Sequence, residues 1–145
     1  MAETIQERNI RLVAEDYYGR VFDQRDLKRA QTLFHKDFIN RTHPNWGEIR
    51  GPAAIIGVVE MLHDGLSGLK TDIHVIMALD NQVMLWATQT GIHDRDGHIM
   101  GKAPDGQRWA SKQAHLIAFN DEGQVVEHDA IRNDLISVSR QGEAV

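Results

Sequence analysis

The spacing of apolar residues changes near Lys70, and this change constrains the fold more than any other feature of the sequence. Before Lys70, apolar side chains recur at the three- and four-residue intervals of amphipathic helices. After it, four segments are rich in the residue types favoured in strands. Because helices come first and strands follow as one run, the order predicts an α+β fold with a curved antiparallel sheet, and it excludes alternating β/α units.

Three helices are predicted before the change. The first covers roughly residues 3–22. The second begins at Asp26, a residue type favoured at helix N-caps, and the third begins after Gly51 and Pro52, where a proline suits the first turn. Residues 38–44 are predicted to form a short extended segment that ends at a proline.

Four strands are predicted after the change, and helices closing over them would leave a cone with a cavity at its wide end. A turn signal at Asp80-Asn81 separates the first two predicted strands, and another at residues 120–123 separates the last two. A loop rich in Gly, Asp and Pro lies between His93 and Gln107. No repeat or linker divides the chain, so a single domain over residues 1–145 is expected. The predicted strands are 71–79, 83–93, 107–119 and 125–138.

Composition excludes several functions. The net charge of −5, with no basic cluster, argues against nucleic acid and anionic membrane as partners. The absence of cysteine excludes disulfides, thiolate metal sites and a cysteine nucleophile. The eight histidines show no zinc-type spacing, so no metal is expected. No signal peptide or membrane span is recognisable, and a cytoplasmic protein is therefore expected.

The turn before the last strand predicts which residues face each other. Residues 121–123 suit a three-residue hairpin loop that ends with a left-handed glycine. Asn120 then faces Gln124, and the same register places His115 opposite Asp129, with Cβ atoms ~5 Å apart. Burial raises the pKa of a carboxyl and a neighbouring imidazolium lowers it, so such a pair can transfer protons near neutral pH.

An ordinary cross-strand contact on a solvated face is the alternative interpretation of His115 and Asp129. A shift of one residue in the register would also separate the two side chains. If the register holds, alternation gives the face of His115 an apolar surround. The side chains on that face are Trp109, Ile117, Phe119 and Ile131.

Three segments resemble the motifs of one family. Gly91-Ile92-His93, followed by residues 97–107, resembles the G-x-H…G-x-x-x-G-x-x-P-x-G signature of the SnoaL-like polyketide cyclases. Residues 120–128 resemble that family's F-x-D-G-x-I-x-E-H segment. Asp37-Phe38 and His43-Pro44 resemble its "pDfv…H-x-P" strand. In order along the chain, the similarity covers about residues 17–135.

The resemblance implies a nuclear transport factor 2-like cone and an enzyme without cofactor that acts on aromatic polyketide intermediates. In that family an Asp on the last strand, partnered by a His on the strand before, serves as acid and base for an intramolecular aldol ring closure. Asp129 and His115 match those places. Two departures leave the reaction open: Asp129 stands where many relatives have Trp, and two extra residues lie within residues 94–96.

The predicted catalytic residues are therefore Asp129 for proton transfer and His115 for orienting it. Trp109, Ile117, Phe119 and Ile131 would form the apolar wall against a flat polycycle. Candidates at the pocket mouth or loop are His43, Trp46, Tyr17 and His93, although Tyr17 also fits a core position and His93 a loop hydrogen bond.

Two other functions remain open at this point. The same pair could serve a hydroxylase of a polycyclic polyketide, in which an enolate meets oxygen. The cone could also be a non-catalytic module that binds a hydrophobic ligand. Relatives and an exposed sheet face suggest a homo-oligomer, either a dimer or a tetramer.

Overall fold

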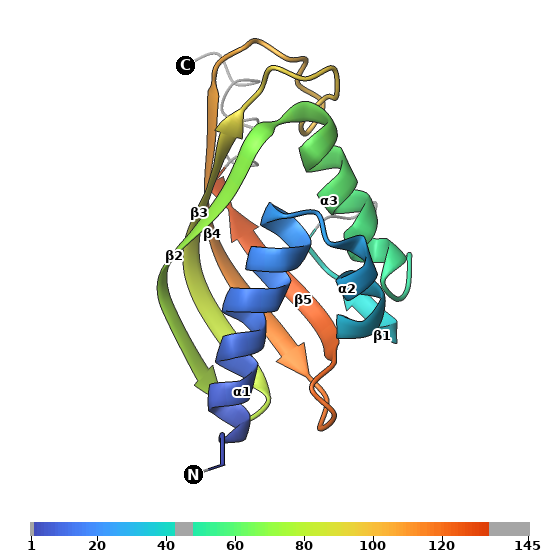
Figure 1. Ribbon diagram of the computed structural model, residues 1–145, viewed down its shortest axis with the longest axis vertical. Helices are drawn as coiled ribbons and strands as arrows, with labels where there is room; N and C mark the ends of the chain where they lie inside the picture. Colours follow the sequence, from blue (N-terminus) through green and yellow to red (C-terminus); the bar gives the residue numbers. More distant parts are fainter. Residues whose placement is uncertain (1, 43–47, 134–145) are drawn as a thin grey trace.

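One five-stranded sheet curves around a layer of helices in the computed structural model, which describes residues 2–42 and 48–133 (Figure 1). The strand order is β1-β5-β4-β3-β2. The helical segments are α1 (Ile5–Arg11), η1 (Leu12–Asp23), α2 (Leu27–Leu33) and α3 (Ala53–Gly65). The strands are β1 (Phe34–Asn40), β2 (Ser67–Leu79), β3 (Gln82–Ile92), β4 (Arg108–Phe119) and β5 (Val125–Arg132).

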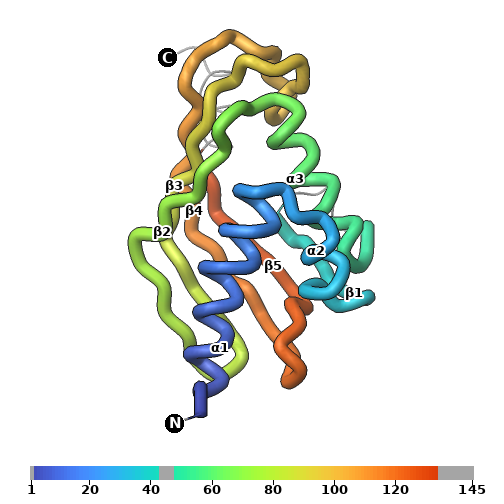
Figure 2. The backbone as a smooth tube through the Cα atoms, viewed as in Figure 1, coloured from blue at the N-terminus to red at the C-terminus, as the bar shows by residue number. Residues whose placement is uncertain are grey.

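The predicted α+β order is confirmed, with one difference in the sheet. Strands β2 to β5 are antiparallel neighbours, as the meander predicts. Strand β1 joins the far edge parallel to β5, so the sheet is mixed. The chain then crosses from β1 through α3 to β2 at the opposite edge (Figure 2). The spacing of apolar residues indicates which face of a short strand is buried, but it does not indicate which strand lies beside it. The pairing of β1 with β5 could therefore not be predicted.

The first predicted helix forms as α1 continued by η1. Thr4 caps the start of this helix, because its hydroxyl accepts from the Glu7 backbone N–H at 3.1 Å. The Glu7 carboxylate in turn accepts from the Thr4 backbone N–H at 2.9 Å, which completes a capping box. Segment η1 has the wider π-helical winding, which is rare over such a length. Tyr17 and Tyr18 on this segment are both buried.

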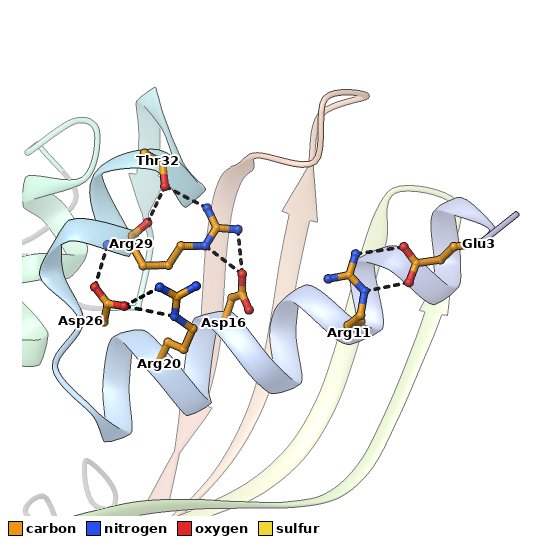
Figure 3. Close-up of polar contacts among 7 residues, drawn as sticks. All are labelled: Glu3, Arg11, Asp16, Arg20, Asp26, Arg29 and Thr32. Atoms are coloured by element: carbon orange, nitrogen blue, oxygen red, sulfur yellow. Dashed lines mark hydrogen bonds and ion pairs between the residues drawn. The ribbon is translucent and has the colours of Figure 1, made fainter.

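Ion pairs join η1 to α2 (Figure 3). Asp26 caps α2 by accepting from the Arg29 backbone N–H at 2.9 Å, as predicted for its position. The Arg29 guanidinium reaches Asp16 on η1 at 2.8 Å, and Arg20 reaches Asp26 at 2.7 Å. These contacts hold the two helices at the angle at which they cover the sheet.

The hairpin between β4 and β5 forms with the predicted turn. Gly123 has φ +79°, in the left-handed region, and the Asn120 N–H donates to the Gln124 carbonyl at 2.9 Å. Phe119 still faces Val125, but in the pair after that Ala118 faces Glu127, because Val126 is an extra residue on β5. This β-bulge shifts the register of the rest of the strand by one residue.

The bulge overturns the predicted pairing of His115 with Asp129. His115 pairs with Ala130, and Asp129 pairs with Leu116 on the side of the sheet away from the helices. His128 takes the inward position and is buried. The predicted pair is wrong because opposed residues share a face only while the count along both strands stays equal.

The outer face of the sheet, away from the helices, carries a continuous apolar surface. Register places Val75, Trp86, Ala114 and Ile131 in one row across β2 to β5. A second row holds Met77, Met84 and Leu116 and ends at Asp129. We name as the outer apolar face the exposed large side chains of these rows with their neighbour: Val75, Met77, Leu79, Met84, Trp86, Leu116 and Ile131.

Among the residues that the structure describes, no helix is both long enough and apolar enough to cross a membrane.

Candidate active site

A pocket lies between the concave face of the sheet and the helices. Its free space is about 20 Å³, which is room for roughly one water molecule. A ligand of several rings would therefore have to displace side chains on entry. The described residues that line it are Tyr18, Phe22, Asn40, Thr42, Ile55, Val58, Gln89, Met100, Gln113, His115, His128 and Arg132.

Two buried histidines stand side by side in the wall of the pocket. His115 Nδ1 lies 2.7 Å from His128 Nε2, and the two rings are 4.9 Å apart between centroids. On the far side, His128 Nδ1 lies 2.7 Å from the Tyr17 hydroxyl. His115 Nε2 lies 2.7 Å from the Gln113 amide oxygen. All four ring nitrogens are therefore engaged within the protein.

Both histidines are held neutral. Burial lowers the pKa of His115 well below its usual range, and the neighbouring His128 and the charge of Arg132 lower it further. Burial and Arg132 lower the pKa of His128 to about 3. At neutral pH the pair therefore carries no charge.

Two hydroxyl groups of the pocket have no hydrogen-bond partner among the residues that the structure describes. These are the Tyr18 Oη and the Thr42 Oγ1, and both atoms are buried. Burial raises the pKa of Tyr18 well above its usual value, so its hydroxyl keeps its proton. A buried polar group without a partner is costly. Each hydroxyl is therefore available to a ligand oxygen.

The described lining of the pocket includes a cationic side chain. Arg132 lines the pocket, and its guanidinium acts on the pKa of His115, His128 and Tyr18. No Asp or Glu is found among the described residues of its lining. Donors and positive charge without a carboxylate suit an oxygen that carries or develops negative charge.

Asp129, the predicted base, does not belong to this pocket. Its side chain is exposed on the outer face beside Leu116, and its carboxylate accepts from the Ala130 backbone N–H at 2.9 Å. Ile131 also lies on the outer face and is 74% exposed, so it is no part of the apolar wall. The bulge at Val126 accounts for both differences.

The other predicted wall residues point inward without lining the pocket. Ile117 and Phe119 are buried in the core, and Trp109 is half-buried against it. Tyr17 is a core residue with a hydrogen bond to His128 rather than a residue of the mouth. The His93 ring donates to its own loop, from Nε2–H to the Gly97 carbonyl oxygen at 2.8 Å.

His43 and Trp46 lie outside the described residues. Within residues 2–42 and 48–133, no group of His, Asp and Glu side chains is arranged to hold a metal ion.

Sequence reasoning found His115 and missed the other polar residues of the pocket. His128 stood in the Glu-His motif, and Gln113 shares the face of His115 by alternation. With the bulge known, the motif would have placed His128 in the pocket, and alternation alone places Gln113 beside His115. Gln89 shares a face with Val83, Leu85 and Ala87 by the same alternation on β3. No such signal marks Arg132, because its inward position depends on the strand register beyond the bulge.

The chain matches a family model and many solved structures. Residues 12–142 match the model of the SnoaL-like polyketide cyclases. A SnoaL-like protein from Jannaschia sp. CCS1, provisionally named a polyketide cyclase, shares 23% identity at a TM-score of 0.75, covering 96% of this chain and 94% of its own. Among curated proteins, no sequence matches the chain.

Two Streptomyces proteins are also similar in structure. AclR from Streptomyces galilaeus, provisionally named a hydroxylase, shares 25% identity at a TM-score of 0.65, covering 84% of this chain and 87% of its own. IdmH from Streptomyces antibioticus, provisionally named a polyketide cyclase, shares 18% identity at a TM-score of 0.66, covering 86% of this chain and 92% of its own.

Proposed function

The chain belongs to the SnoaL-like polyketide cyclase family, and we propose that it is an enzyme that closes a ring in an aromatic polyketide intermediate. The reaction we propose is an intramolecular aldol-type cyclisation without a cofactor. The observation that carries this proposal is a pocket with two hydroxyl groups, from Tyr18 and Thr42, that find no partner in the described part of the chain and lie beside a neutral histidine pair and a cationic arginine.

An aldol-type cyclisation requires stabilisation of an oxygen anion. A carbon between two carbonyl groups is already acidic, and it loses its proton to solvent to give an enolate. The electron pair of the enolate forms the new C–C bond to a carbonyl carbon of the same molecule, and the π pair of that carbonyl moves to its oxygen. The alkoxide then takes a proton from solvent, so the product is an isomer of the substrate.

The pocket supports each charged stage of this reaction. The Tyr18 hydroxyl donates to the enolate or alkoxide oxygen, and the charge of Arg132 favours binding of the anion. The described lining offers no carboxylate as a base. Both rings are neutral and their nitrogens are bonded within the protein, so we assign the His115–His128 pair to ordering the pocket wall rather than to removal of the substrate's proton.

The test is product formation from an anthracycline-type polyketide ester, in air and without oxygen. We expect the wild-type chain to form a cyclised product without oxygen, and His115→Gln to lose most of this activity. Asp129→Asn is the control and should keep it, since Asp129 lies on the outer face. Activity lost in Asp129→Asn and kept in His115→Gln would contradict the proposal.

Two other outcomes decide between functions. A product that gains oxygen only in air would replace the cyclase by a hydroxylase that uses the same enolate. Tight binding without turnover, unchanged in His115→Gln, would leave a module that binds a hydrophobic ligand.

We also propose that the chain forms a homo-oligomer through the outer apolar face. One of its rows is apolar across four strands and the other across three before it ends at Asp129, and patches of this kind mark association sites. Sedimentation velocity tests this: Trp86→Glu should yield monomers. Ile49→Glu, which places the same charge on another exposed apolar residue, should not. A wild-type chain that sediments as a monomer would contradict the proposal.

A further inference from the structure

Six hydrogen bonds join seven side chains in a single line along the pocket wall. From Tyr17, the line passes through the two histidines to Gln113 and Gln89, and then leaves the pocket. The successive distances are 2.7 Å (Tyr17–His128), 2.7 Å (His128–His115), 2.7 Å (His115–Gln113), 2.9 Å (Gln113–Gln89), 3.2 Å (Gln89–Thr71) and 2.7 Å (Thr71–Asp23).

Asp23 fixes the direction of the bonds nearest to it. An ionised carboxylate only accepts. Its Oδ2 accepts from the Thr71 backbone N–H at 3.0 Å, and its Oδ1 accepts the single proton of the Thr71 hydroxyl. Thr71 Oγ1 must then accept from the Gln89 amide N–H.

The two glutamines carry the same direction to the histidines. Because the Gln89 nitrogen faces Thr71, its amide oxygen accepts from Gln113 Nε2. The Gln113 oxygen is thereby turned toward His115 and accepts from Nε2–H of that ring. Ser111 leaves this direction unchanged, since Gln113 Nε2 also donates to its hydroxyl at 3.1 Å.

The tautomers of both histidines follow from this direction. A neutral imidazole with a proton on Nε2 has a bare Nδ1. His115 Nδ1 therefore accepts from Nε2–H of His128, and His128 Nδ1 accepts the Tyr17 hydroxyl proton. Every bond then runs the same way, from Tyr17 to Asp23, and aligned bonds strengthen one another.

We propose that Asp23 is a positioning residue that holds His115 and His128 as Nε2–H tautomers, so that the hydrogen bonds along the pocket wall all run in one direction. Asp23 acts through the intervening side chains and does not line the pocket. Amide groups do not readily pass a proton on, so the line orients the histidines rather than conducting protons. This inference rests on the role proposed above for the histidine pair.

Asp23→Asn should reverse the line. The Thr71 backbone N–H can only donate, so the new amide oxygen faces it and the new NH₂ faces Thr71 Oγ1. The Thr71 hydroxyl must then donate to Gln89, and both glutamine amides turn over. The expected result is that His115 and His128 change from Nε2–H to Nδ1–H.

The measurement is ¹⁵N NMR of the full chain with ring-labelled histidine at about pH 8, where protonated and bare ring nitrogens give separate resonances. The signals are assigned by their loss in His115→Gln and His128→Gln. Asp72→Asn is the matched control: it removes the same charge one residue from Thr71, on an exposed side chain outside the line. It should leave both tautomers unchanged.

A second pair of variants keeps the inference testable if Asp23→Asn does not fold. Thr71→Val cuts the link to Asp23 and should give mixed tautomers, whereas Thr71→Ser should restore the wild-type signals. Nδ1–H signals in the wild type, or unchanged Nε2–H signals in both Asp23→Asn and Thr71→Val, would overturn the inference. No substrate is needed, so this failure is distinct from failure of the proposed cyclase activity.

Discussion

Two adjacent tyrosines show how much single residues of the same type can differ. The Tyr17 hydroxyl bonds to His128, whereas the Tyr18 hydroxyl has no partner among the described residues. Both rings are buried, and burial raises the pKa of both hydroxyl groups. The first tyrosine therefore supports the structure of the site, and the second is the one that we propose to donate to the substrate.

Tyr18→Phe should lower activity without lowering stability. The hydroxyl gives the fold no hydrogen bond, so the free energy of unfolding should stay equal or rise slightly. A lost hydrogen bond to a charged oxygen costs about 1.5–3 kcal/mol, which corresponds to roughly 10- to 100-fold in kcat/KM. Steady-state kinetics and urea unfolding measure the two quantities.

Tyr17→Phe is the matched control and should do the opposite. It leaves His128 Nδ1 without a donor, which costs about 1–3 kcal/mol of unfolding free energy. If Tyr18→Phe destabilises the protein as much as Tyr17→Phe, the Tyr18 hydroxyl has a structural partner and the assignment is wrong.

The depressed pKa of His128 predicts that stability falls in mild acid. An unfolded histidine binds a proton below about pH 6.5, while the folded His128 does so only near pH 3. Stability is therefore complete above the unfolded pKa and declines by about 1.4 kcal/mol per pH unit as the pH falls. His115 contributes in the same direction.

Urea unfolding between about pH 5 and pH 8 measures this dependence. The slope should be steep below about pH 6.5 and shallower in His128→Gln. A wild-type slope equal to that of His128→Gln would show that His128 titrates normally in the folded chain.

At the scale of elements, the order of helices and strands could be predicted and their pairing only in part. The Asp26 cap, the third helix after Pro52 and the turn at Gly123 are local signals and proved correct. The π-helical winding of η1 and the bulge at Val126 leave no such signal. The bulge turns His128 and Arg132 toward the pocket, and sequence reasoning therefore missed both residues.

Gly123→Ala should destabilise the β4–β5 hairpin. The φ of +79° lies where a side chain costs roughly 1–2 kcal/mol. Gly123→Asn should cost less, because Asn tolerates this conformation better. The free energy of unfolding of the two variants checks this, and equal losses would point to crowding against Arg8, whose Nε lies 3.4 Å from an added Cβ.

For the molecule as a whole, the small pocket means that binding and packing compete. Helices η1 and α3 and strands β1, β3, β4 and β5 all contribute to its lining. A ring system can enter only if these elements separate slightly or side chains retract. The measured affinity is then lowered by the free energy of opening.

Met100→Ala should therefore tighten the binding of a flat aromatic probe, 1,8-dihydroxyanthraquinone, by removing a side chain that fills the pocket. The added cavity should lower stability by about 1–2 kcal/mol at this half-buried position. Met61→Ala, on α3 but outside the lining, is the control for titration calorimetry. Equal or weaker binding in Met100→Ala would mean that another element opens.

The bulge at Val126 decides which of two alternating sets of β5 side chains faces the pocket. In the present register His128 and Arg132 face the pocket, while Asp129 and Ile131 face outward. Deleting the one extra residue would exchange the two sets, giving an acidic interior opposite His115 and a basic exterior. A one-residue change in strand register can thus replace the ionisable groups that face the pocket, although none of those residues is substituted.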